Sequence, residues 1–168
     1  TQLITNSHAT KKDLMDVFGV PQEKIQVLHN SVVNYDKNEV INVVKLKKYD
    51  VVYVGRLHIS KGVSTLIEAI SLLKEQNNVV NLAIIGSGPE MLNLKNLVSQ
   101  YRLEDNIVFL GNQSKPDVLA AFKSAKIAVV PSTSEAFGFT VIEAMSMKTC
   151  VIGANNTGIK EIIVEQKW

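Results

Sequence analysis

The sequence predicts an α/β fold: an open, parallel, Rossmann-like sheet with helices on both faces. Five short apolar runs indicate the strands, because each is continuous rather than alternating, as in strands buried on both faces. They are VVYVG ending at Gly55, NLAIIG at Gly86, IVFLG at Gly111, KIAVVP at Pro131 and TCVIG at Gly153. Segments of helical character separate the runs, and such strand–helix repeats form parallel sheets with right-handed crossovers.

Four helices are expected between these strands. Residues 61–75 place apolar side chains on one face at helical spacing. The next helix spans residues 90–100 and follows Pro89, a residue suited to the first helical position. Residues 116–124 and 139–147 complete the alternation.

The first thirty residues are expected to form a smaller unit. LITNS has the character of a strand end, and Ser7 is a suitable cap for a helix over residues 9–18. Gly19 ends that helix, and KIQVLHN predicts a second short strand. The polar and charged residues 34–48 are interpreted as a connector to the main sheet.

Length and composition are those of one globular domain of 168 residues with a net charge of +2. The scattered Lys and Arg residues do not mark a nucleic-acid track. Cys150, the only cysteine, lies in an apolar run and is expected to be a buried, inert thiol. His8, His29 and His58 lie in separate segments without metal-ligand spacing. Neither a membrane-length apolar run nor a signal peptide is visible, so we expect a cytoplasmic location.

Any chemistry is expected at the carboxyl ends of the strands, which share one rim in a parallel sheet. The first loop there, GRLHISKG, supplies Arg56 and Lys61, two cations that could hold a diphosphate; ordinary surface charges are the alternative. The second loop, GSGPEM, has Met91 in place of a third glycine, which argues against a hydride-transfer fingerprint. Its glycines fit either close approach of a ligand or a tight turn.

The stretch SEAFGFTVIEA carries two carboxylates, Glu135 and Glu143, around a predicted helix start at Gly138. Free amides at a helix start form an anion site. Glu143 could accept hydrogen bonds from vicinal hydroxyls, and Glu135 could reach another part of the same ligand. Alternatively, Glu135 favours the helix dipole and Glu143 is solvated. Paired carboxylates also suggest glycoside hydrolysis, but a hydrolase has no obvious need for phosphate-binding groups.

A known family is similar to most of the chain, about residues 51–164. The segments that carry the resemblance are, in order, GRLHISKGVSTLIEAI, IIGSGPEMLNLKNL, NIVFLGNQSKPDVLAAFKSAKIAVVPSTSEAFGFTVIEAM and NNTGIKEII. They resemble the C-terminal domain of retaining family-4 glycosyltransferases of the GT-B fold. The most specific part is the pair of glutamates with seven residues between them, preceded by VPSTS.

The resemblance implies a division of the chain. Residues 1–33 are similar to the end of such an enzyme's N-terminal domain and the start of its linker, and residues 34–48 form a connector. Residues 49–168 would be the nucleotide-sugar-binding, Rossmann-like domain, truncated at its C-terminus. One departure is that Lys148 and Thr149 stand where the family commonly has Gly and Pro.

The resemblance also implies an activity: transfer of a sugar from a nucleotide diphosphate sugar to an acceptor hydroxyl, with retention of configuration. Glu135 would contact the donor sugar, while Arg56 and Lys61 would bind the diphosphate; these three are the predicted catalytic residues. The predicted donor-binding residues are Glu143 at the ribose, Phe137, Gly138, Phe139 and Thr140 at the diphosphate, Gly111, Asn112 and Gln113 at the base, and Gly55 and Gly86 in the loops.

No metal or other cofactor is expected, because the cations and helix amides can stabilise the leaving diphosphate. The acceptor, whether glycan, lipid or small molecule, would bind through an N-terminal domain of which these residues contain only the end. Peripheral association with the inner face of a membrane would also need that part. We expect the fragment alone to bind nucleotide weakly and to transfer nothing. The alternatives are a non-catalytic nucleotide-sugar-binding or partner-binding module, or a phosphorylase or epimerase of the same fold.

Overall fold

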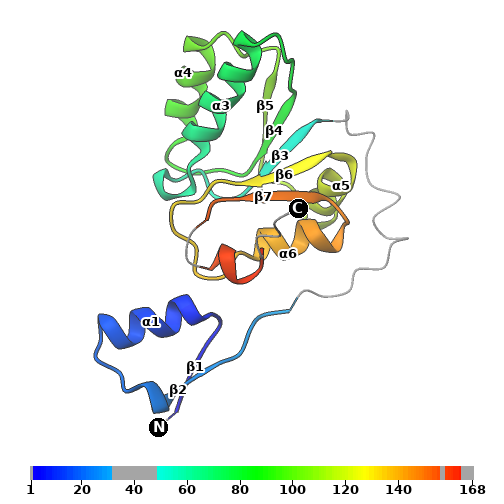
Figure 1. Cartoon of the computed structure of the whole chain (residues 1–168). Coiled ribbons are helices and arrows are strands. Elements are labelled where there is room, and N and C mark those ends of the chain that lie inside the picture. The colour runs from blue at the N-terminus through cyan, green and yellow to red at the C-terminus, as the bar shows by residue number, and fades with distance from the viewer. Residues whose placement is uncertain (1, 32–48, 156–157, 164–168) are drawn as a thin grey trace.

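The computed structural model describes residues 2–31, 49–155 and 158–163, and the predicted connector at 34–48 lies outside them. The first part is a small β–α–β unit (Figure 1). Its elements are β1 (Leu3–Thr5), α1 (His8–Asp16), a 3₁₀ turn η1 (Gln22–Lys24) and β2 (Ile25–Val27), with β1 and β2 parallel. Ser7 caps α1 as predicted, since its side chain accepts a hydrogen bond of 3.0 Å from the backbone N–H of Thr10.

The predicted parallel sheet is confirmed, with strand order β5-β4-β3-β6-β7 and every pairing parallel. The strands are β3 (Val51–Val54), β4 (Leu82–Ile85), β5 (Ile107–Gly111), β6 (Ile127–Val130) and β7 (Cys150–Gly153). All five carboxyl ends therefore lie at one edge of the sheet, as the sequence predicts.

Helices cover both faces of this sheet (Figure 1). Two helices, α3 (Val63–Glu75) and α4 (Met91–Gln100), lie on one face, and α5 (Lys115–Ser124) and α6 (Phe139–Ser146) lie on the other. Alternate residues of β3 divide the core between the two faces: Val51 and Tyr53 pack with α3 and α4, and Val52 packs with α5 and α6. This alternation follows from the period of two along a strand.

Two predicted helix starts are wrong by a few residues. Residues 59–61 form a separate 3₁₀ turn, η2 (Ile59–Lys61), so α3 begins only at Val63. The next helix, α4, begins at Met91, so Pro89 precedes its cap, Glu90. A further 3₁₀ turn, η3 (Ile159–Glu161), follows β7.

Cys150 is exposed, which corrects the expectation of a buried thiol. The reason is its place in the sheet: it opens β7, which is an edge strand, so one side of its backbone and side chain lacks a neighbouring strand. An apolar run in the sequence does not distinguish an edge strand from a central one.

Asp50 joins the amino ends of three strands at the edge opposite the predicted site. Its carboxylate accepts a hydrogen bond of 2.9 Å from the backbone N–H of Asn81, just before β4, and lies 2.7 Å from the ammonium of Lys126, just before β6. The hydrogen bond from Lys126 and that from Asn81 hold the pKa of Asp50 below its usual value.

We expect Asp50→Asn to change how stability depends on pH. Because the folded-state pKa lies below the unfolded one, the carboxylate stabilises the fold above about pH 4 and loses this effect as pH falls through the folded pKa. Urea denaturation should show the variant less stable than the parent at pH 7, with the difference shrinking below about pH 4. Asp16→Asn, at an exposed position of α1, is the matched control. A difference independent of pH would contradict the prediction.

Candidate functional site

The carboxyl ends of β3, β4 and β5 open into a pocket of about 380 Å³. Five residues predicted for donor binding or catalysis line it: Gly55, Arg56, Gly86, Asn112 and Gln113. The remaining lining residues are Val54, Ile85, Ser87 and Val118. The strand ends thus bring together residues from three loops that are separate in the sequence.

Backbone contacts fix these loops against one another. The N–H of Gly55 donates to the carbonyl of Ile85 at 3.0 Å, and that of Leu57 donates to Ser87 at 2.9 Å. The N–H of Gly86 donates to the carbonyl of Gly111 at 2.8 Å. Gly111 does not line the pocket, but its carbonyl holds Gly86, which does.

Gly86 occupies a position that only glycine fits. Its φ is +135°, and a Cβ there would lie 1.9 Å from the carbonyl oxygen of Gly55. Of the two interpretations that the sequence leaves open for this loop, the structure supports a tight turn, packed on the neighbouring loop.

Tyr53 holds the loop that carries Arg56. The Tyr53 side chain is buried, and its hydroxyl donates a hydrogen bond of 3.0 Å to the backbone carbonyl of Arg56. Burial raises the pKa of Tyr53, and the negative charge of Glu135 raises it further. The Tyr53 hydroxyl therefore stays protonated and able to donate. Tyr53 was missed in the sequence, although a phenol within an aliphatic strand was a usable signal.

Lys61 and Glu135 form an ion pair of 2.7 Å between the loops that follow β3 and β6. Each side chain is about a quarter exposed. A second contact ties the same loops: the N–H and hydroxyl of Thr133 donate to the carbonyl of Ser60 at 2.9 and 3.1 Å. Two of the three predicted catalytic residues are thus held together, but neither of them is among the residues that line the pocket. The third, Arg56, lines the pocket and lies on the same loop as Lys61.

The predicted helix start at Gly138 is confirmed, because Gly138 caps α6 with a φ of +100°. Phe139 and Thr140 occupy the first turn, where backbone N–H groups have no partner within the helix. Phe137 is buried, and its ring meets that of Phe139 edge to face at 5.5 Å between centroids. This aromatic pair fixes the direction in which the chain enters α6.

Glu143 is not among the residues that line the pocket. The Glu143 side chain is 15% exposed, and its carboxylate forms an ion pair with Lys115 at the start of α5. A carboxylate with so little exposure to water needs a partner, and Lys115 supplies one. Lys115 follows the loop of Asn112 and Gln113, so Glu143 lies next to the helix that leads out of the pocket. Lys115 was not predicted.

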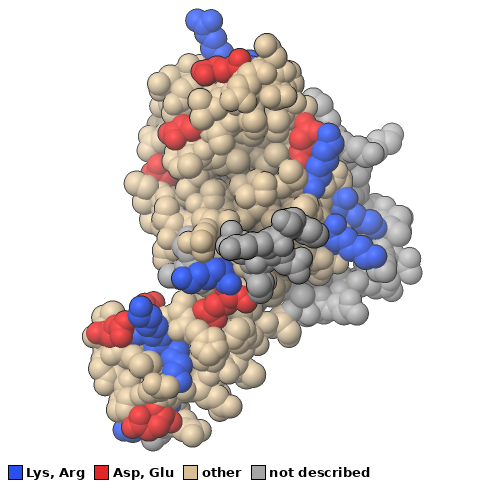
Figure 2. All heavy atoms as spheres, viewed as in Figure 1, with Lys and Arg blue, Asp and Glu red and all other residues tan. Residues whose placement is uncertain are grey.

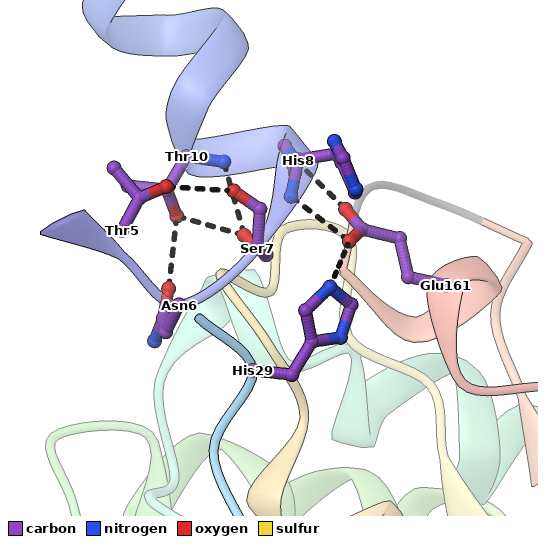
Figure 3. Close-up of polar contacts among 8 residues, drawn as sticks. Thr5, Asn6, Ser7, His8, Thr10, His29 and Glu161 are labelled. Carbon is purple, nitrogen blue, oxygen red and sulfur yellow. Dashed lines mark hydrogen bonds and ion pairs between the residues drawn. The ribbon is translucent and has the colours of Figure 1, made fainter. Parts of the chain in front are cut away.

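The structure also assembles residues that the sequence separates. His8, His29 and Glu161 offer ligand atoms within 4.8 Å of one another (Figure 3), although the histidines lie in separate segments of the sequence; His58 is not part of this group. The sequence carries no signal for this, because Glu161 is 153 residues from His8.

Positive and negative side chains are mixed on the described surface (Figure 2), as expected for a net charge of +2. Figure 2 shows Lys and Arg side chains in small groups interspersed with Asp and Glu, and no continuous basic track appears among the described residues of that face. Among the described residues, none of the helices is long and apolar enough to cross a membrane.

Comparisons with known proteins agree on one family. The family model for glycosyl transferases, group 1, matches residues 34–167. An uncharacterized glycosyltransferase of Methanocaldococcus jannaschii is 32% identical over 96% of this chain and 44% of its own length. The gpi3 subunit of the phosphatidylinositol N-acetylglucosaminyltransferase of Schizosaccharomyces pombe is 31% identical over 67% of this chain and 25% of its own length.

Among solved structures, that of Anabaena HepE in complex with UDP and glucose has the same fold. It superposes with a TM-score of 0.82 and 23% identity, over 98% of this chain and 47% of HepE. The chain therefore spans less than half the length of each of these three proteins.

Proposed function

The chain belongs to the group 1 glycosyl transferases and has the fold of GT-B enzymes, and from this we propose that it is the donor-binding domain of a retaining glycosyltransferase. The donor is a nucleotide diphosphate sugar, whose sugar passes to an acceptor hydroxyl. The observation that carries the proposal is the pocket at the carboxyl ends of β3, β4 and β5, with Arg56 in it and the Lys61–Glu135 pair on the adjoining loops.

In this proposal the diphosphate lies between Arg56, Lys61 and the first turn of α6. Fixed cations and helix amides stabilise the negative charge that develops as the bond from the sugar to the diphosphate breaks. Such an arrangement supplies the stabilisation without a metal, and we propose that none is needed for the transfer. The guanidinium of Arg56 can bind two phosphate oxygens at once.

The two glutamates have separate roles. Glu135, held by Lys61, contacts the donor sugar. Glu143, which forms an ion pair with Lys115 in this structure, accepts hydrogen bonds from the ribose hydroxyls. Asn112 and Gln113 meet the base, since they line the pocket on its β5 side. Support for these roles comes from the positions of the residues on one rim and from the resemblance of their motifs.

The acceptor site belongs to the part of the protein outside these residues. The chain covers 47% of the HepE chain. On the resemblance of its motifs, we propose that its opening unit is the end of an N-terminal domain. A glycan, lipid or small-molecule acceptor would bind to that domain. We propose that the isolated fragment binds nucleotide diphosphates weakly and transfers nothing.

Calorimetric titration with UDP, GDP and ADP tests the proposal, with UMP, GMP and AMP as the controls that lack the second phosphate. We expect one diphosphate to bind at one site, and more tightly than its monophosphate. Arg56→Ala should weaken binding by about tenfold or more, the effect of one charge-assisted hydrogen bond. Lys123→Ala, in the last turn of α5, removes a charge of the same sign and should have no effect. Absence of binding by all three diphosphates would favour a partner-binding module instead.

A further inference from the structure

Three potential metal ligands meet where the small β–α–β unit contacts the main domain (Figure 3). His8 begins α1, His29 follows β2, and Glu161 ends the 3₁₀ turn η3. One ligand atom from each lies within 4.8 Å of the others, and Nε2 of His29 is 3.9 Å from Oε2 of Glu161.

The carboxylate in this group is already oriented. Its two oxygens accept hydrogen bonds from the backbone N–H groups of His8 and Ala9, at 2.9 and 2.8 Å. Glu161 is 14% exposed at its side chain, so its position is fixed by packing as well as by these bonds. Hydrogen-bonded carboxylates of this kind are common in metal sites, because the outer partners hold the ligand in place.

The two histidines supply the remaining ligands on the solvent side. Both are exposed, and their rings lie edge to face with centroids 5.8 Å apart. The ring of His29 also packs edge to face on that of Phe137, with centroids 5.9 Å apart. The ligands of one tetrahedral zinc ion lie about 3.3 Å from one another, for bonds of about 2.0–2.1 Å. The observed spacing therefore needs only small side-chain rotations to close around an ion.

We propose that His8, His29 and Glu161 form a zinc site that fastens the β–α–β unit to the main domain. Two imidazoles and one carboxylate are a common ligand set for Zn²⁺, with water in the fourth position. Each carboxylate oxygen has a second lone pair, so Glu161 can bind the ion while it still caps α1. None of the three residues is among those that line the pocket at the ends of β3, β4 and β5, and the proposed transfer reaction uses none of them as a ligand.

The competing interpretation is that Glu161 serves only as a cap for α1 and the histidines are ordinary surface residues. In that case the contacts of Glu161 would be the same, but the two imidazoles would not contribute to metal binding. Variants of the histidines alone therefore separate the two interpretations, because they leave the cap in place.

Titration of the tag-free protein with Co²⁺ tests the site, since cobalt occupies zinc sites and absorbs visible light there. We expect an absorption band that saturates at one equivalent and disappears on addition of Zn²⁺, which binds more tightly. His8→Ala and His29→Ala should each weaken cobalt binding by at least about tenfold, no less than the loss of an outer-shell partner. His58→Ala is the matched control and should bind as the parent does.

A second measurement does not depend on colour. Zinc should raise the urea midpoint of the parent and of His58→Ala, and should leave that of His29→Ala unchanged. The proposal is overturned if no cobalt band appears, if His58→Ala weakens binding as much as His29→Ala, or if zinc stabilises all of these proteins equally.

Discussion

Gly86→Ala is expected to destabilise the protein by at least about 3 kcal/mol, as the sum of backbone strain and overpacking. The added methyl group would lie 1.9 Å from the carbonyl oxygen of Gly55, which belongs to the backbone and cannot rotate away. The loops after β3 and β4 would have to separate, and the pocket between them would change shape. Urea denaturation measures the loss of stability, and titration with nucleotide measures the effect on the pocket.

Gly111→Ala is the matched control for this prediction. Gly111 also has a positive φ, +66°, but a Cβ there meets nothing within 4 Å. Its substitution should lower the free energy of unfolding only by the strain of alanine in the left-handed conformation, about 1 kcal/mol. The steric argument fails if the two variants lose equal stability, or if Gly86→Ala is as stable as the parent.

Lys61→Ala should weaken the binding of a nucleotide diphosphate by about tenfold to a hundredfold, the equivalent of one or two charge-assisted hydrogen bonds. Glu135→Gln should have the opposite tendency. It removes a negative charge 2.7 Å from the Lys61 ammonium, so the cation is left to the diphosphate and binding is unchanged or tighter. Calorimetric titration of the two variants with the same nucleotide gives the comparison.

The two variants are informative as a pair because only Lys61→Ala is expected to weaken binding. If the Lys61–Glu135 pair only held two loops together, both substitutions would disturb the site and both would weaken binding. Equal losses in the two variants, with the same loss of stability to urea, would therefore contradict a role for Lys61 at the diphosphate. The double variant should bind as weakly as Lys61→Ala alone.

Most of the fold could be predicted because its signals are local. Each strand is a short continuous run that ends at Gly or Pro, and each helix has its own periodicity. What failed depended on context. Cys150 looks buried in the sequence, but its strand lies at the edge of the sheet. Lys148 takes a φ of +62°, a conformation that glycine adopts more easily, so the turn after α6 forms without the glycine that the family commonly has there.

The candidate site was predictable in part for the same reason. Motifs at the ends of parallel strands must meet, so the residues around Gly55, Gly86 and Asn112 could be placed together. Which side chains pair across the rim could not be predicted, because the partners come from different loops. Lys115 for Glu143 and Tyr53 for Arg56 are examples. The roles of these residues in binding remain predictions.

The contact of Glu161 with the start of α1 has a consequence for the order of events during synthesis. The backbone groups of His8 and Ala9 leave the ribosome more than a hundred residues before the side chain that satisfies them. At about 5–20 residues per second, the nascent helix waits several seconds or longer for its distant cap. The opening unit can therefore take its final place only after Glu161 has emerged.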